Sequence, residues 1–260
     1  NHVGDWVDSG RFPHRSHWNV YIAYFAGIFI DCPSCLGMEI VNNTDRVTRG
    51  DRELWDELLQ VVIPKGRNIW AFADDDSEKL NEVGRSFEFF VLPENNEANV
   101  KKAMKDGNFF AASKYYKTTD GVGDFDGDGN VPLVTDIKVD QKANTITVAT
   151  DPTRDCRVIE WIADGKVIAT GNTIDLNDYE KDLGCYIRFQ MKGSGGVTYS
   201  QPFELQYKGR IDKPVPSWAL WAFKTEAGQK FMKFYHSRSF ALGAFIAEKI
   251  RILIEDNIKK

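Results

Sequence analysis

Three polar segments in the first third of the chain contain residue types that bind metal ions. His2 lies in the first segment (residues 1–6), Glu39 in the second (37–43), and Asp76 and Glu78 in the third (70–78). Each segment lies where a short apolar strand is expected to end. Because the loops that follow the strands of β/α folds build their active sites, we expect these side chains to lie near one another.

The chemistry of these residue types suits a divalent cation. Carboxylate oxygens bind hard cations, and imidazole suits zinc, iron and manganese. The pattern therefore indicates a site for manganese, zinc, magnesium or iron. Each residue also has an ordinary interpretation: a single His near a chain start is usually solvated, Asp74–Asp76 would fit a polar loop or a helix cap, and Glu39 would fit a surface position.

Helix and strand patterns alternate over residues 1–116, which we take as the first domain. The segments with helical spacing are 17–29, 51–61 and 97–105, and the apolar runs typical of strands are 38–42, 68–73, 86–92 and 109–112. Asp51 is placed as a helix cap, and Gly107 ends the third helix. This alternation predicts parallel strands joined by helical crossovers.

The composition changes after residue 116. Residues 117–133 form a loop rich in Gly and Asp, in which Asp124, Asp126 and Asp128 alternate as at the start of an EF-hand calcium loop. Thr135 occupies the position where such a loop carries a bidentate Glu, and strand patterns rather than helices flank the loop. A calcium site and a solvated turn both remain open.

Residues 134–208 show strand patterns with a period of two, separated by turn signals such as Asp164-Gly165. The strands are expected near residues 145–148, 158–162, 166–168, 186–189 and 199–205, which is typical of an immunoglobulin-like β-sandwich. Residues 209–260 follow as two expected helices, at about 217–235 and 238–257. Their many aromatic and aliphatic residues indicate packing on the first domain or on a second copy of the chain, and the second alternative would make the protein a homo-oligomer.

Charge and hydropathy exclude several classes of partner. The net charge of −5 argues against binding to the phosphate backbone of nucleic acids. The apolar stretch at residues 240–254 is too short to span a membrane, and Glu248, Lys249 and Arg251 interrupt it. No signal peptide is visible, so a soluble protein is expected, and its compartment, including export, stays open.

Four cysteines are present, and only Cys32 and Cys35 are close in sequence, as C-x-x-C. A zinc site normally needs a second such pair or suitably spaced histidines. Cys156 and Cys185 lie far apart in the sequence. Unpaired thiols, a redox pair or disulfide at Cys32 and Cys35, and a zinc site are the three interpretations.

The order and spacing of several motifs resemble one known family. The motifs are N-H-x-G at residues 1–4, G-M-E-I-V-N-N at 37–43, R-E-L-W-D-E-L-L at 52–59, W-A-F-A-D-D-D-S-E at 70–78, A-M-K-D-G-N-F-F-A-A-S at 103–113, I-E-W-I-A-D-G-K-V-I-A-T-G at 159–171 and Y-S-Q-P-F at 199–203. Over residues 1–207 the chain resembles the C-terminal half of the PHP (polymerase and histidinol phosphatase) superfamily of metal-dependent phosphoesterases, followed by the small β-domain of such members.

This resemblance implies a distorted β/α barrel with up to three divalent metals bound by His, Asp and Glu at strand ends. His2 matches the His of an N-H-P-G turn, Asp76 matches the Asp of a late D-x-H ligand pair, and Glu39 matches a carboxylate near the site. Glu78 replaces the His of the late pair. That replacement adds negative charge and shifts the expected preference from zinc toward magnesium, manganese or calcium.

The H-x-H strand end with which the family begins is not found in this sequence. A complete barrel of this type needs roughly 200–250 residues, so we expect the chain to hold only the second half of one. The expected function is a metal-dependent phosphoesterase that acts on a phosphorylated small molecule or a phosphodiester and is incomplete on its own. The alternative is a non-catalytic binding protein that has kept part of the barrel without its metals.

Overall fold

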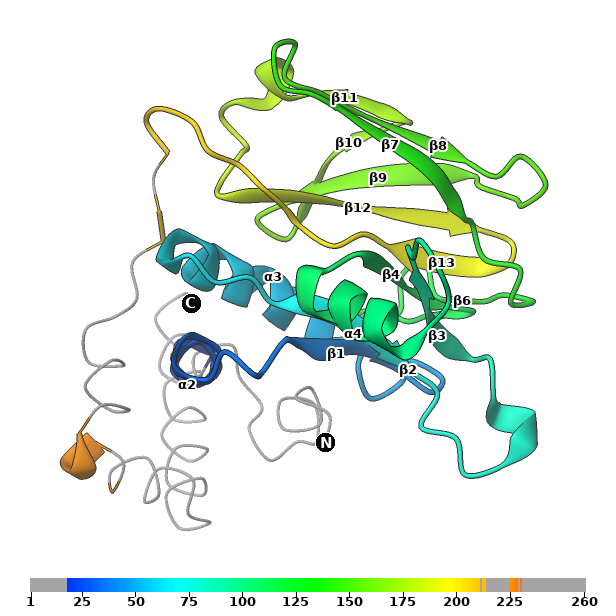
Figure 1. The fold of residues 1–260 in the computed structure, drawn as a ribbon, viewed down its shortest axis with the longest axis horizontal. Helices are drawn as coiled ribbons and strands as arrows, with labels where there is room; N and C mark the ends of the chain where they lie inside the picture. The colour runs from blue at the N-terminus through cyan, green and yellow to red at the C-terminus, as the bar shows by residue number, and fades with distance from the viewer. Residues whose placement is uncertain (1–17, 211, 214–224, 229, 231–260) are drawn as a thin grey trace, which may run out of the picture.

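The computed structural model describes residues 18–210, 212, 213, 225–228 and 230, and the structural statements below concern these residues (Figure 1). The helices are α2 (Trp18–Asp31), α3 (Asp51–Val62) and α4 (Glu97–Asp106), with short 3-10 helices η2 (Ile63–Lys65), η3 (Leu80–Glu82) and η4 (Leu176–Tyr179). The strands are β1 (Gly37–Asn42), β2 (Trp70–Asp74), β3 (Ser86–Phe90), β4 (Phe109–Ser113), β5 (Tyr115–Tyr116), β6 (Phe125–Asp126), β7 (Val134–Asp140), β8 (Thr145–Thr150), β9 (Val158–Ala163), β10 (Lys166–Thr170), β11 (Thr173–Asp175), β12 (Tyr186–Gly193), β13 (Gly196–Tyr199) and β14 (Phe203–Glu204). The fold is mixed α/β, and most of its strands pair antiparallel.

A parallel pair of strands covered by helices forms the first part of the fold. β1 and β2 align from Gly37 beside Trp70 to Asn42 beside Asp74. Helix α3 packs on this pair because one of its faces is apolar and buried. Trp55 of α3 is fully buried and donates its indole N–H to the carbonyl of Ile69 at 2.9 Å, which ties the helix to the start of β2.

The residue that ends α4 is the one expected from the sequence, whereas the cap of α3 lies one residue earlier than expected. Asn96 caps α4 by accepting a hydrogen bond from the backbone N–H of Asn99, and Gly107 ends it with φ 75°. Asp51 was expected as the cap of α3, but Gly50 occupies the cap position and Asp51 lies in the first helical turn. A carboxylate in that turn still interacts favourably with the helix dipole.

The pairing of β3 with β4 differs from the parallel pairing that was expected throughout the first domain. They pair antiparallel, from Ser86 beside Ser113 to Phe90 beside Phe109. The parallel prediction is confirmed for β1 and β2 and is wrong for β3 and β4. The intervening α4 has only Ala103 buried, and the chain leaves it into β4, which runs antiparallel beside β3.

The sheet that contains β3 and β4 continues into the β-rich part of the chain. β4 also pairs with β13, so the seven-stranded sheet has the order β10-β9-β12-β13-β4-β3, with β14 beside β12. Residues 86–113 and residues 158–204 therefore share one sheet. Residues 117–133, which were expected to form a loop, connect the segment that contains β4 to the segment that contains β13. Hydrogen bonds between β4 and β13 also join these two segments directly.

A second, three-stranded sheet of β11, β8 and β7 faces part of the first, as Figure 1 shows. The core between them is apolar and contains Ile146, Val148, Trp161, Ile187 and Phe189. The strands expected near 145–148, 158–162, 166–168 and 186–189 are confirmed by β8, β9, β10 and β12. Asp164 and Gly165 form the predicted turn, with φ of 48° and 75°.

The sheets that the described residues form are open, and no closed barrel is present among them. His2 and most of the two predicted tail helices, with the oligomer interface expected there, lie outside the described residues. Within the part of the chain that the structure describes, no helix is long and apolar enough to cross a membrane.

Candidate functional site

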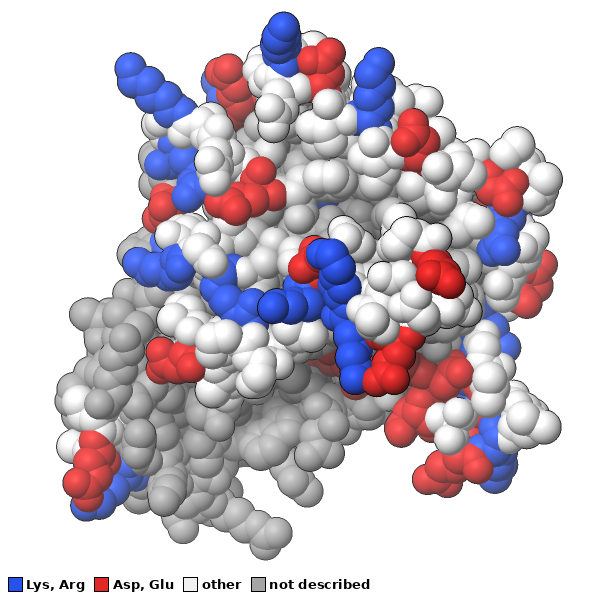
Figure 2. Space-filling model, in the orientation of Figure 1, with Lys and Arg blue, Asp and Glu red and all other residues white. Residues whose placement is uncertain are grey.

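An open pocket of about 750 Å³ lies where β1 and β2 end and β3 begins. Its lining is strongly acidic and consists of Glu39, Asn42, Ala73, Asp74, Asp75, Asp76, Ser86, Phe87 and Glu88. We call this the acidic pocket. Figure 2 shows Asp and Glu side chains gathered at the lower right of the molecule, around the connection between β2 and β3.

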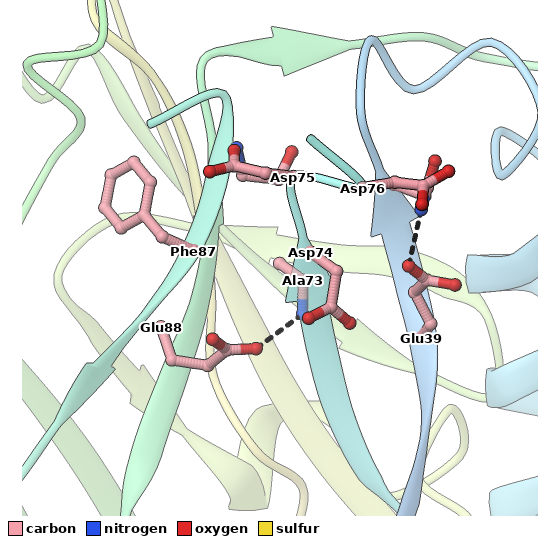
Figure 3. A pocket seen from close by; sticks show the side chains of 9 residues that line it. Glu39, Ala73, Asp74, Asp75, Asp76, Phe87 and Glu88 are labelled. Atoms are coloured by element: carbon pink, nitrogen blue, oxygen red, sulfur yellow. Dashed lines mark hydrogen bonds between the residues drawn. The ribbon is translucent and has the colours of Figure 1, made fainter. Parts of the chain in front are cut away.

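Three neighbouring strands bring the acidic side chains together. Glu39 comes from β1, Asp74 from the end of β2 and Glu88 from β3, and Figure 3 shows them directed toward one shared space. Asn42 at the end of β1 lies beside Asp74, because the two strands are parallel and their register shifts by one residue between Glu39 and Val41. Parallel pairing therefore places the polar residues that follow both apolar runs at the same edge of the sheet.

Glu39 is held by the end of its own strand. The side-chain amide of Asn42 donates to Glu39 Oε1 at 2.7 Å. The backbone N–H of Asn42 donates to Thr48 Oγ1 at 2.9 Å, and the Thr48 hydroxyl donates to Asp45 Oδ1 at 3.0 Å. Asp45 in turn forms a buried ion pair with Arg52 of α3, at 2.8 Å. This chain of contacts fixes the position of Glu39 relative to helix α3.

Glu88 has an unusual protonation equilibrium. Its Oε1 accepts a hydrogen bond from the backbone N–H of Ala73 at 2.9 Å. Partial burial, followed by the negative charges of Asp74 and Asp75, raises the pKa of Glu88 from its ordinary value of 4.5 to about 7, although the hydrogen bond from Ala73 opposes this rise. Near neutral pH, Glu88 therefore exists as a mixture of the acid and the carboxylate.

Asp75 stabilises the loop between β2 and β3 at the border of the pocket. Its carboxylate accepts hydrogen bonds from the backbone N–H groups of Gly84, Arg85 and Ser86 at 2.7, 2.6 and 2.8 Å. These contacts bring the loop after β2 back to the start of β3. Asp76, the next residue, has a left-handed backbone with φ 47° and lines the pocket with an exposed side chain.

The structure brings together only part of the site predicted from the sequence. Glu39 and Asp76 both line the acidic pocket, Asp76 from the loop after β2 and Glu39 from within β1 rather than from its end. Glu78 does not line it; its side chain is exposed, and its backbone N–H donates to Glu82 at 3.0 Å. His2 lies outside the described residues. Sequence reasoning missed Glu88, whose only local signal is an acidic residue within the aromatic strand Ser86–Phe90.

The acidic pocket offers oxygen ligands, the type preferred by hard divalent cations. Among the described residues, however, no three His, Cys, Asp or Glu side chains form a group able to hold a metal ion. The carboxylate oxygens of the pocket suit such a cation. The described residues, however, supply too few ligands to complete its coordination. Any metal site here needs ligands in addition to the described ones.

The three aspartates of the predicted calcium loop make separate local contacts. Asp124 Oδ1 accepts hydrogen bonds from the backbone N–H and the hydroxyl of Thr118, at 2.8 and 3.0 Å. Asp126 lies on the short strand β6 and forms an ion pair with Lys117. Asp128 Oδ1 accepts from the backbone N–H of Asn130 at 2.8 Å. Their contacts are those of a hydrogen-bonded turn, and calcium binding stays a prediction.

Comparison with known proteins does not assign the chain to a family. No family model, curated protein or solved structure matches it. The geometry and charge of the acidic pocket, together with the sequence motifs, are therefore the basis for a functional proposal.

Proposed function

We propose that this chain carries part of a metal-dependent phosphoesterase site of the PHP type. In this proposal β1, α3 and β2 belong to a distorted β/α barrel, and the acidic pocket supplies carboxylate ligands for a divalent cation. Glu39 and Asp76 are the proposed ligands, and Asp74 and Glu88 complete the acidic environment. The observation that carries the proposal is the meeting of carboxylates from three strands in one pocket.

The location of the pocket supports a role in hydrolysis. Active sites of β/α folds lie at the carboxyl ends of parallel strands, and the acidic pocket lies at the carboxyl ends of β1 and β2. A divalent cation bound there would stabilise negative charge on a phosphoryl group and lower the pKa of a bound water. The chain's own contribution is to place and orient the carboxylates that hold the cation.

The charge of the pocket determines what can enter it. None of the nine residues that line it is basic, so the carboxylates would repel a phosphate in the absence of a cation. The proposed substrate, a phosphorylated small molecule or a phosphodiester, therefore requires the metal for binding as well as for reaction. Glu78 is a weaker candidate ligand than Asp76, because it does not line the pocket.

The proposed site is incomplete within the described residues, which contain no group of three metal ligands. We propose that His2 and further residues of a longer protein complete it. The same observation favours the alternative function, a non-catalytic binding protein that uses part of a barrel without its metals.

The experiment is a calorimetric titration of the 260-residue chain with Mn²⁺ and with Mg²⁺, together with an assay of p-nitrophenyl phosphate hydrolysis. We expect weak Mn²⁺ binding that is lost in Asp76→Asn and Glu39→Gln, and little or no turnover. Glu180→Gln, an exposed acidic residue far from the pocket in the β-domain, is the matched control and should bind as the wild type does.

Two outcomes would change this conclusion. If neither ion binds to the wild type, the metal-site proposal fails and the binding-protein alternative is favoured. If the wild type turns over the substrate rapidly and Asp76→Asn abolishes that turnover, the chain is catalytically complete and the expectation of a partial site is wrong.

A further inference from the structure

Cys32 and Cys35 lie on a tight turn between α2 and β1. Cys32 continues the last turn of the helix, since its backbone N–H donates to the carbonyl of Ile28 at 2.8 Å. The backbone N–H of Cys35 then donates to the carbonyl of Cys32 at 2.9 Å, which closes a four-residue turn with Pro33 at its second position. Proline is favoured at that position because its fixed φ matches the turn.

This turn gives the two cysteines a spacing that suits a disulfide. In a closed turn, the first and fourth Cα atoms are less than roughly 7 Å apart. A disulfide needs Cα atoms that are about 4.4–6.8 Å apart, so the backbone can accommodate the bond without a large movement.

The side chain of Arg67, which comes from a later part of the chain, forms hydrogen bonds to the same turn. Its guanidinium donates to the carbonyl of Phe29 at 2.9 Å, to that of Pro33 at 3.3 Å and to that of Cys35. Three backbone carbonyls around the turn are thus fixed by one side chain. The turn is already ordered with its thiols unlinked, and little conformational entropy would be lost when they are joined.

The other two cysteines have environments that oppose thiol chemistry. Cys185 is buried, and burial raises the pKa of its thiol to about 12. Burial also raises the pKa of the Cys156 thiol. A reactive thiol must ionise and be reached by its partner. Cys32 is exposed, Cys35 and Cys156 are partly exposed and Cys185 is buried. Cys32 is therefore the most accessible of the four thiols, and the turn places Cys35 close to it in the fold.

We propose that Cys32 and Cys35 are a dithiol site that forms a reversible disulfide by exchange with a low-molecular-weight disulfide such as oxidised glutathione. The Cys32 thiolate attacks one sulfur of glutathione disulfide, forms a mixed disulfide and releases one glutathione thiolate. The Cys35 thiolate then attacks the Cys32 sulfur and releases the second glutathione thiolate. The two cysteines together lose two protons and two electrons, which glutathione disulfide takes up to become two glutathione molecules.

The test is peptide mapping of the full chain after incubation in glutathione buffers of increasing oxidised fraction and trapping with iodoacetamide. Cys32 and Cys35 fall in one tryptic peptide, residues 16–46, whereas Cys156 and Cys185 fall in two others. We expect the 16–46 peptide to become unalkylated and lighter by two hydrogens under oxidising conditions, and to recover both alkyl groups with dithiothreitol. The peptides with Cys156 and Cys185 should keep their alkylation.

A variant separates the two steps. Cys35→Ser should stop the reaction at a glutathione adduct on Cys32, with no peptide lighter by two hydrogens. A stable glutathione adduct in the wild type, or two thiols that stay alkylatable in fully oxidised buffer, would overturn the proposal. So would tight stoichiometric zinc binding that protects both thiols from oxidation. The wild-type measurement stands without the variant, so poor folding of Cys35→Ser leaves the test intact.

Discussion

Arg188 and Asp56 form a buried two-point ion pair that joins α3 to the β-domain. Arg188 Nε and Nη2 lie 2.7 and 2.6 Å from the two carboxylate oxygens of Asp56, and both side chains are almost fully buried. Tyr186 Oη donates to the same carboxylate at 2.7 Å, and the guanidinium carbon of Arg188 lies 4.9 Å from the ring centroid of Trp55. One residue of α3 thus pairs with two residues of β12.

We predict that Asp56→Ala destabilises the fold by about 3–5 kcal/mol, because it leaves the Arg188 guanidinium buried without its counter-charge. Urea unfolding followed by circular dichroism measures the effect. The control is Glu97→Ala, which removes an exposed ion pair with Lys101 and should leave the unfolding midpoint unchanged. The double variant Asp56→Leu with Arg188→Met should lose less than Asp56→Ala; an equal or larger loss would contradict the unpaired-charge explanation.

We predict that the stability of the protein falls as pH rises through the range set by Glu88. The folded-state pKa of Glu88 is about 7 and its ordinary value is 4.5, so between these values the folded state binds more protons than the unfolded state. The stability contributed by this raised pKa is present below pH 4.5 and is lost as pH rises through 7. Glu88→Gln, which stays neutral, should therefore exceed the wild type by about 1–3 kcal/mol at pH 8 and converge with it near pH 4.5.

Urea unfolding at several pH values tests this. Glu94→Gln, an exposed site outside the pocket, serves as the control and should track the wild type. A difference between Glu88→Gln and the wild type that does not depend on pH would show that the effect is not a titration of Glu88.

The proposed metal site leads to a prediction for pH as well. A cation near Glu88 favours its charged form, so binding of Mn²⁺ should release a proton wherever Glu88 is protonated in the free protein. With a pKa of about 7, the Mn²⁺ affinity should rise about tenfold between pH 6 and pH 8, and Glu88→Gln should remove this dependence. Calorimetry in buffers of different ionisation enthalpy counts the released protons. Equal pH dependence in both proteins would exclude Glu88 from the site.

Asp75 is predicted to hold the loop between β2 and β3. Asp75→Ala removes the acceptor of three backbone N–H groups and should cost about 1–3 kcal/mol of stability. The loop should then open more often, and hydrogen exchange at residues 84–86 should be faster. Limited trypsin cleavage after Lys79 should increase as well. Glu78→Ala in the same loop is the control, because its side chain is exposed, and it should leave hydrogen exchange at residues 84–86 unchanged.

Local patterns in the sequence predicted the elements well and their pairing less well. The period-two runs of β8 and β9 depend on neighbouring residues alone, and both strands were correctly placed. The direction in which β4 pairs with β3 depends on the path of the chain around α4, which the apolar pattern of either strand does not contain. The pairing of β4 with β13 joins residues far apart in the sequence and was not predicted.

The candidate site was likewise predicted where it depends on the local sequence and was missed where it depends on tertiary contacts. Glu39 and Asp76 were expected together because each belongs to a polar segment at an expected strand end. In the structure Glu39 lies within β1 and Asp76 follows the end of β2, and both line the pocket. Glu88 reaches the pocket only because β3 folds back beside β2, which is a tertiary event. Glu78 was expected in the pocket from its distance of two residues from Asp76. The left-handed backbone of Asp76 redirects the chain at that point, and Glu78 does not line the pocket.

The shared strand β4 has a consequence for how the molecule folds. The β13 edge of the β-domain is paired only when β4 is in place, and β4 comes from more than eighty residues earlier in the chain. Contacts of such long sequence separation raise contact order, so we expect folding to be slow and a single cooperative transition to involve both halves. Residues 134–208 produced alone would expose β13 as an unprotected edge, and such edges are templates for intermolecular strand pairing and aggregation.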